Sequence, residues 1–257
     1  MKSPDLALEN LVATDAALEQ TPEQKWRSLS VELLNELFAP LSFEERLRQL
    51  YRFFPEGEVL LTSSFGTKSA YLLQLISEIR PTQPVYFIDT TYHFKETIQY
   101  KEALTQKLGL NVIDLLPHAE ENKMTREEEW WRDHPRMCCA INKVSALEPV
   151  KAAHKVWISG LMSHQTEFRS QLRIFEQQGD ILKFHPLIDM DEGEWLYRMG
   201  IHQLPSHPLE ALGFGSIGCE PCTQPGEGRN GRWQGKRSEC GLHPNYFINK
   251  KQNKVSQ

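Results

Sequence analysis

The chain has 257 residues and a net charge of −5, and 40% of its residues are hydrophobic and 25% charged. A chain of this size and composition can bury a sizeable core, and its negative charge argues against nucleic acid as a general partner. The sequence contains no apolar run of membrane-spanning length and no signal-peptide core near its start. We therefore expect a cytoplasmic protein without membrane association, in which structural disulfides are rare.

Residues 1–41 are expected to form a helical extension that is loosely packed up to about residue 25. Ser42 to Glu45 matches a capping box, and apolar residues then recur at helical spacing until Pro55 ends the helix. After that, β-rich runs alternate with helical patterns. We expect strands at 59–62, 85–88, 112–116 and 156–158, and helices at 69–79, 93–108 and 142–153. This alternation predicts an α/β fold with a mostly parallel sheet flanked by helices.

A hairpin is predicted from residues 172–176 and 181–184, followed by a short helix capped by Asp191 and closed by Gly200. From Gly213 onward the sequence is rich in glycine, proline and charge, so we expect its order to come from a ligand or a metal. No repeat or linker divides the chain. We therefore expect one domain over 1–257, with a nucleotide- and cluster-binding core at 42–225 and a mobile C-terminal tail at 226–257.

The tail is basic. It carries seven basic and two acidic residues, a net charge of +5 that leaves −10 for the rest of the chain. Such a tail suits an anionic substrate, although a solvated terminal segment would have the same composition.

Thr62 to Ser69 form a small-residue turn between the first predicted strand and the next helix. Backbone N–H groups of Ser63, Ser64 and Gly66 could approach a phosphate or sulfate there. The turn matches neither the Walker nor the dinucleotide pattern, and a plain turn is the simpler alternative.

Asp89 lies at the end of the second predicted strand, where open α/β sheets bind ligands. It is therefore placed for a ribose contact. Capping of the next helix is the alternative.

Five cysteines form the most informative pattern: two are adjacent, two form a C-x-x-C, and one lies alone in the basic tail. The first four are Cys138, Cys139, Cys219 and Cys222. Adjacent cysteines reach one tetrahedral zinc ion awkwardly but can bind separate irons of a cubane, which favours an iron–sulfur cluster. Zinc, a redox C-x-x-C and structural thiols are the alternatives.

The fifth cysteine, Cys240, follows Lys236 and Arg237 and precedes His243. Neighbouring positive charge favours the thiolate that a nucleophile requires, whereas the adjacent Glu239 opposes it. Lys143 lies four residues after the adjacent cysteine pair and would share a helix face with its second member. It could compensate the charge of a cluster or substrate, with an exposed lysine as the alternative.

Together these motifs resemble the assimilatory sulfonucleotide reductases, specifically the iron–sulfur adenylyl-sulfate reductases, over residues 45–245. The two cysteine pairs and the run from Glu239 to His243 carry the resemblance. The Ser63–Gly66 turn is similar to the modified PP-loop of that family, and residues 87–90 to its next strand end. The resemblance implies an adenine nucleotide α-hydrolase-like fold.

By position, the resemblance implies that Cys138, Cys139, Cys219 and Cys222 bind a [4Fe–4S] cluster and that Cys240 is catalytic. The implied substrate contacts are Ser63, Ser64, Gly66, Asp89, Lys143, Arg169, Arg229, Arg232 and His243. The chain departs from the family at Leu161 to Gln165, because members often carry an Arg-Arg pair there; Arg169 follows a few residues later.

The implied reaction reduces adenylyl sulfate to sulfite and AMP, in sulfate assimilation and cysteine biosynthesis. Cys240 would form an S-sulfocysteine, thioredoxin or glutaredoxin would release sulfite, and the glycines of the tail would let it move. The resemblance leaves room for a homo-oligomer. The alternatives are a reductase of the 3′-phosphorylated substrate, a PP-loop ATP-pyrophosphatase and a non-enzymatic iron–sulfur module. Phe65, Thr67 and Lys68 replace residues of the full PP-loop, which argues against ATP cleavage.

Overall fold

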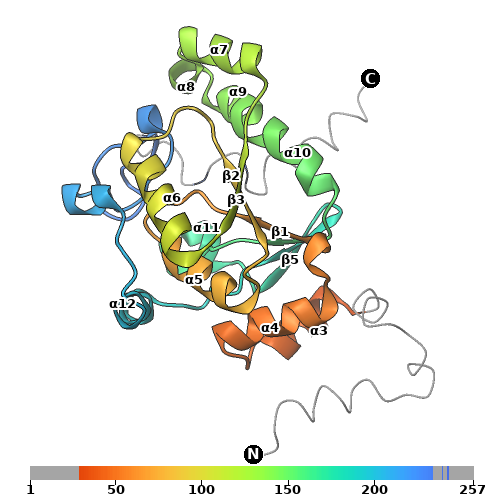
Figure 1. Cartoon of the computed structure of the whole chain (residues 1–257). Helices are drawn as coiled ribbons and strands as arrows, with labels where there is room; N and C mark the ends of the chain where they lie inside the picture. Colours follow the sequence, from red (N-terminus) through yellow and green to blue (C-terminus); the bar gives the residue numbers. More distant parts are fainter. Residues whose placement is uncertain (1–28, 234–238, 240–241, 243–257) are drawn as a thin grey trace, which may run out of the picture.

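A six-stranded sheet forms the centre of the protein (Figure 1). The computed structural model describes residues 29–233, 239 and 242. The strands are β1 (Val59–Thr62), β2 (Pro84–Ile88), β3 (Asn111–Leu115), β4 (Val156–Ile158), β5 (Phe175–Gln178) and β6 (Ile181–Phe184). They lie in the order β3-β2-β1-β4-β6-β5, and only the edge strand β5 is antiparallel to its neighbour. The expected α/β fold with a mostly parallel sheet is confirmed.

Alternate residues of the central strands pack on opposite faces of the sheet, as the two-residue period of a strand requires. Val59 and Leu61 join the larger hydrophobic core, whereas Leu60 joins a smaller one on the other face. The larger core is covered by α3 (Val31–Phe38), α4 (Phe43–Phe53), α5 (Ala70–Ile79), α6 (Lys95–Leu108) and α12 (Glu192–Ile201). The smaller core is covered by α10 (Ser145–Ala152), which lies across the sheet from α3 and α4 (Figure 1).

A chain of short helices connects β3 to α10. It consists of α7 (Ala119–Glu127), α8 (Trp130–Asp133), α9 (Pro135–Cys139) and a π-helical turn at Ala140–Val144. Further short elements are α11 (Glu167–Ser170) and 3-10 turns at Glu56–Glu58, Ser163–Gln165, Pro208–Leu212 and Glu220–Cys222. None of the helices among the described residues has the length and apolarity needed to cross a membrane.

Most predicted elements are present, with shifted ends. The capping box forms at Ser42, where the hydroxyl accepts from Glu45 N and the Glu45 carboxylate accepts from Ser42 N. The hairpin exists, but its first strand begins at Phe175 rather than at residue 172, and its turn is Gly179-Asp180. The helix expected at 142–153 begins earlier, because the polypeptide is already helical from Pro135.

The glycine-rich segment after Gly213 forms backbone hydrogen bonds of its own, and the expectation that a ligand or metal orders it stays a prediction. Gly215 N donates to Gly226 O (3.0 Å), Gly226 N to Gly213 O (2.9 Å) and Gln224 N to Gly231 O (2.9 Å). A methyl group at Gly226 or Gly231 would collide with the facing backbone. These two glycines therefore serve close packing in this structure, and the mobility expected of the tail stays a prediction. Gly235 and the tail from residue 243 onward lie outside the described residues.

Candidate functional site

A cavity of about 600 Å³ opens at the carboxyl ends of β1 and β4. β1 has β2 on one side and β4 on the other. The order of the strands along the sheet therefore changes direction at β1. Open α/β sheets bind ligands at such a switch in strand order. The segments after β1 and β4 form much of the wall, and residues 215–219, Arg229 and Arg232 from the glycine-rich segment complete it.

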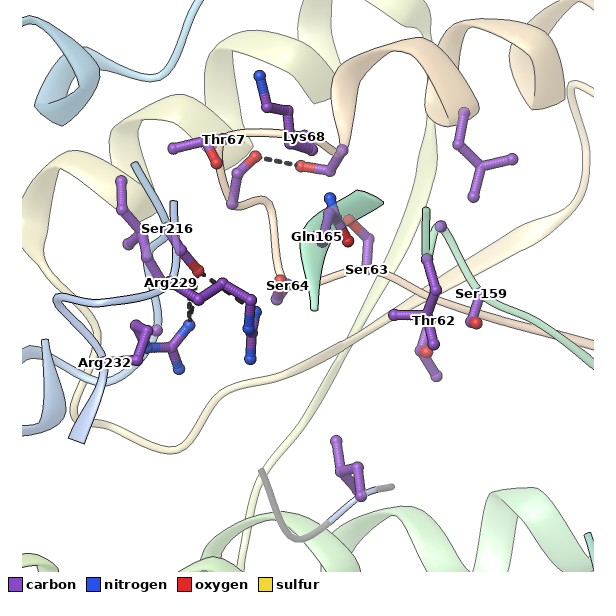
Figure 2. Close-up of a pocket in the computed structure, with 18 of the residues that line it drawn as sticks. Thr62, Ser63, Ser64, Thr67, Lys68, Ser159, Gln165, Ser216, Arg229 and Arg232 are labelled. Atoms are coloured by element: carbon purple, nitrogen blue, oxygen red, sulfur yellow. Dashed lines mark hydrogen bonds between the residues drawn. The ribbon is translucent and has the colours of Figure 1, made fainter. Parts of the chain in front are cut away.

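The turn after β1 contributes Ser63, Ser64 and Gly66 to this wall. Figure 2 shows the two serines. Its shape depends on Phe65, whose φ of 47° lies in the left-handed region that side chains other than glycine rarely adopt. The Phe65 ring is fully buried and lies edge-on to Phe87, with centroids 5.7 Å apart. This packing offsets the backbone strain, and the small residues on either side leave the backbone close to the cavity.

Two arginines of the glycine-rich segment face the turn. Arg229 and Arg232 lie beside Ser216 in Figure 2, on the other side of Ser64 from Ser159. Arg232 is buried, and its Nη1 donates to Ile217 O (2.9 Å) and Ser216 Oγ (3.2 Å). Both guanidinium groups lie over the Trp233 ring, at 4.4 Å for Arg232 and 5.7 Å for Arg229. The cavity therefore has a rigid cationic wall suited to phosphate or sulfate.

Arg169 also lines the cavity and is buried. Its Nε and Nη2 donate to the two carboxylate oxygens of Glu239 (2.7 and 2.8 Å). Its Nη1 donates to the side-chain oxygen of Gln165, Oε1. The departure from the family pattern at 161–165 therefore lies in the site itself. Gln165 orients Arg169, and His164 contacts Glu192 (3.3 Å).

The four cysteines of the two pairs line a second, smaller cavity. Cys138 and Cys139 end α9, while Cys219 and Cys222 flank the turn at 220–222. Tyr92, Trp131, Pro135 and Pro221 close the space around them. Cys219 is fixed by β-bridge pairing with His93. The sequence prediction that these four thiols belong together therefore agrees with their placement.

A buried polar network surrounds the thiols. Asn142 Nδ2 donates to Cys138 O (3.0 Å) and lies 3.5 Å from Cys138 Sγ, and Thr90 Oγ1 lies 3.4 Å from Cys219 Sγ. Asn122 joins the two sides by donating to Asn142 Oδ1 (2.7 Å) and Thr90 O (3.1 Å). Hydrogen bonds to sulfur are the outer-shell contacts that orient and tune thiolate ligands.

The donor set fits a cluster better than a single ion. Burial, followed by the charge of Cys139, raises the pKa of the Cys138 thiol to about 12, with smaller effects from Cys219 and Cys222. None of these four cysteines forms a disulfide. Among the described residues, however, no three His, Cys, Asp or Glu side chains are grouped to hold one metal ion. A cubane binds each cysteine through a different iron, so it does not require the thiols to converge on one point.

Lys143 and Cys219 line both cavities, so the cysteine centre adjoins the larger pocket. Lys143 lies on the π-helical turn that follows Cys139, on the side facing the pocket wall. A positive charge thus borders both cavities, and the compensation of cluster or substrate charge by Lys143 stays a prediction.

Asp89 does not line the pocket. Its Oδ1 accepts from Thr91 N (2.8 Å), as in a local turn, and the expected ribose contact stays a prediction. Cys240 and His243 lie outside the described residues.

Sequence reasoning missed Gln165, Lys183 and Ser216 on the pocket wall because they belong to no motif. It also missed Asn142, although its position four residues after Cys138 on a helical segment was a usable signal.

Residues 58–225 match the profile of the phosphoadenosine phosphosulfate reductase domain family. The chain belongs to this family. It is similar to proteins named adenosine 5'-phosphosulfate reductase from Bacillus cereus (strain ZK / E33L), at 38% identity, and from Bacillus mycoides (strain KBAB4), at 39%. Each match extends over 199 residues, 73% of this chain and 85% of the relative.

Solved structures support the fold. Phosphoadenylyl-sulfate reductase from Candida auris, in a phosphate complex, superposes with a TM-score of 0.67 at 23% identity, covering 77% of this chain and 98% of that one. FMN adenylyltransferase from Candida glabrata, with FMN and an ATP analogue, gives 0.53 at 16% identity, covering 90% and 85%. These similarities confirm the adenine nucleotide α-hydrolase-like fold.

Proposed function

We propose that this protein reduces adenylyl sulfate to sulfite and AMP in sulfate assimilation. The observation that carries the proposal is a four-thiol centre that shares Lys143 and Cys219 with a cation-lined nucleotide pocket. Family membership and the names of the Bacillus relatives support the same reaction. The place of the reaction is the cytoplasm, and the reductant is thioredoxin or glutaredoxin.

The pocket residues divide into two roles. Ser63, Ser64 and Gly66 present the turn after β1 to the nucleotide, while Arg229 and Arg232 bind the anionic end. Guanidinium groups match phosphate and sulfate oxygens in a bidentate manner, and burial strengthens each contact. Lys143 completes the cationic surface toward the thiol centre. His243 stays a proposed contact from the resemblance, and Asp89 is left out because of its placement.

Cys138, Cys139, Cys219 and Cys222 would hold a [4Fe–4S] cluster. When bound, the cluster would supply order and electrostatic polarisation beside the anionic end of the substrate. The contribution of the chain itself is the surrounding network: Asn142 and Thr90 approach two of the sulfurs, and Lys143 places a cation at the boundary with the pocket.

The chemistry would proceed in two half-reactions. The Cys240 thiolate attacks the sulfur of adenylyl sulfate, a new S–S bond forms, and the S–O bond to the phosphate breaks, so AMP leaves with the electron pair. A dithiol reductant then attacks the cysteine sulfur of the S-sulfocysteine. Sulfite departs, Cys240 is left in a mixed disulfide, and the second thiol of the reductant resolves it. The dithiol supplies both electrons and ends as a disulfide.

A reductase of 3′-phosphoadenylyl sulfate is the second candidate, because the matching family is described by that substrate. The test is kcat/KM for both sulfonucleotides with anaerobically purified protein. We expect a preference for adenylyl sulfate, in line with the four-cysteine set. Equal or better use of the phosphorylated substrate would reject the specificity, and no sulfite from either substrate would reject the reaction.

A further inference from the structure

Lys68 is a cation of the pocket wall that has no part in the substrate contacts described above. It belongs to the turn after β1, and its Nζ lies 2.6 Å from Oε1 of Glu192, the first residue of α12. The ammonium group also lies over the ring of Trp195, 3.5 Å from the ring centroid, and Trp195 is only 2% exposed. An ammonium between a buried indole face and a carboxylate is held in a defined position.

His164 lies against the other oxygen of the same carboxylate. Its Nε2 is 3.3 Å from Glu192 Oε2. Its Nδ1 donates to Met190 O (3.0 Å), because a carbonyl oxygen can only accept, and this hydrogen bond turns Nε2 toward the carboxylate. Lys68, His164 and Glu192 all line the cavity. The Glu192 carboxylate therefore lies between two nitrogen groups of the pocket wall, and it marks a place where the pocket binds an anionic group.

This place lies apart from the two arginines that face the turn. Figure 2 shows Lys68 well separated from Arg229 and Arg232. A nucleotide whose anionic end contacts these arginines therefore brings another of its parts toward Lys68. In adenylyl sulfate the remaining parts, ribose and adenine, are uncharged. In the 3′-phosphorylated nucleotide the ribose carries a second phosphate, which would meet the carboxylate of Glu192.

We propose that Lys68 and His164 form a second anion subsite of the pocket, and that Glu192 occupies this subsite and thereby excludes a 3′-phosphate. Glu192 is then a specificity-determining residue. The proposal rests on the proposed function and gives a physical reason for the preference for adenylyl sulfate, because a like charge at the contact point rejects the competing ligand. Removal of the carboxylate leaves the Lys68 charge available to a phosphate in its place.

The test measures the dissociation constants of AMP and of adenosine 3′,5′-bisphosphate by isothermal titration calorimetry at one fixed ionic strength. Wild type is compared with Glu192→Gln and with Glu194→Gln. Glu194 lies on the same helix, pairs with Arg198 at 2.7 Å and does not line the cavity, so it controls for the loss of one carboxylate. We expect Glu192→Gln to bind the bisphosphate about tenfold more tightly, the lower end for a charged hydrogen bond, and AMP within about threefold of wild type. Glu194→Gln should change neither constant.

A second variant assigns the effect to Lys68. Lys68→Met keeps an unbranched side chain over Trp195 and removes the charge. In combination with Glu192→Gln it should cancel the gain in affinity for the bisphosphate. The same pattern should appear in kcat/KM, with Glu192→Gln using 3′-phosphoadenylyl sulfate about tenfold better and adenylyl sulfate nearly as before. Iron content and far-UV circular dichroism verify that each variant is folded.

An unchanged ratio of the two dissociation constants in Glu192→Gln would overturn the proposal. So would a gain that persists in the double variant, because the attraction would then come from the general field of the pocket and not from Lys68. Binding of neither nucleotide to Glu192→Gln would overturn it as well. The proposed function fails separately, if wild-type protein binds both nucleotides but forms sulfite from neither sulfonucleotide, and the ratio of dissociation constants still decides the role of Glu192.

Discussion

The Arg232 guanidinium lies against the backbone of Gly218, so closely that a methyl group on Gly218 would overlap it. The side chain passes this point to reach Ile217 O, to which its Nη1 donates at 2.9 Å. The absence of a side chain at Gly218 therefore determines where one cation of the pocket lies.

Gly218→Ala should displace Arg232 and weaken substrate binding. We expect KM for adenylyl sulfate to rise about tenfold, the scale of one charged hydrogen bond, with a smaller change in kcat. Steady-state kinetics measure this. Gly200→Ala on α12 is the matched control, since an added methyl group there meets nothing within 4 Å. A Gly218→Ala variant with wild-type KM would show that this position of Arg232 is not needed.

The four clustered cysteines, Cys138, Cys139, Cys219 and Cys222, predict the metal content of the purified protein. Anaerobically purified protein should be brown and contain about four irons and four sulfides per chain, the composition of a cubane. Cys219→Ser should remove the colour and the activity, because the hydroxyl is a poor iron ligand. Cys240→Ser should retain both iron and colour. Stoichiometric zinc in protein expressed with adequate iron would contradict the assignment.

Thr90 offers a finer test of the same centre, because its hydroxyl lies 3.4 Å from Cys219 Sγ. Thr90→Val keeps the shape and removes the hydroxyl, and with it the contact to Cys219 and a long hydrogen bond from Tyr92 N (3.4 Å). We expect the cluster to assemble and to be lost faster on exposure to air, since outer-shell partners stabilise metal ligands. Absorbance decay near the charge-transfer band follows the loss. An unchanged decay would mean that the contact has no stabilising effect.

His185, which contacts the pocket residue Ser159, predicts how the stability of the protein depends on pH. It is 1% exposed, and its Nδ1 lies 2.7 Å from Ser159 Oγ. Burial, and then the charges of Lys183 and Arg169, lower its pKa to about 3. The unfolded state takes up a proton near the ordinary histidine pKa of about 6.5, whereas the folded state does not. The free energy of unfolding should therefore fall as pH decreases from above 6.5 toward 3.

His185→Asn should make this pH dependence shallower, by up to about 1.4 kcal/mol per pH unit, the value for one proton. Urea unfolding of the anaerobic protein at pH 7.5, 6.0 and 5.0 measures it. Replacement of the exposed His118 by asparagine is the control and should leave the slope unchanged. Equal slopes in His185→Asn and wild type would show that the imidazole is protonated in the folded protein.

The sequence was sufficient for the fold because the sheet depends on local patterns. Buried strands such as Val59–Thr62 and the capping box at Ser42 are visible as residue types at fixed spacing. The four thiols were also predictable, because few structures need two cysteine pairs. The Arg169–Glu239 pair was not, since its members are 70 residues apart and meet only in the folded chain. Asp89 is a similar case, because a strand end does not reveal which way its side chain turns.

The ordering of the glycine-rich segment was unpredictable for a related reason. Glycine permits both mobility and close backbone packing, and composition alone cannot distinguish them. Gly226 and Gly231 pack against facing backbone, which is a property of pairs of segments and not of either sequence alone.

The most direct test of the account is the mass of the protein after mixing with adenylyl sulfate and no reductant. We predict a gain of one sulfonate, about 80 Da as expected for a covalent intermediate, on the peptide that contains Cys240. Thioredoxin should remove the label and release sulfite, and Cys240→Ser should never acquire it. A label on Cys219 or Cys222, or a Cys240→Ser variant that still produces sulfite, would contradict the proposed mechanism.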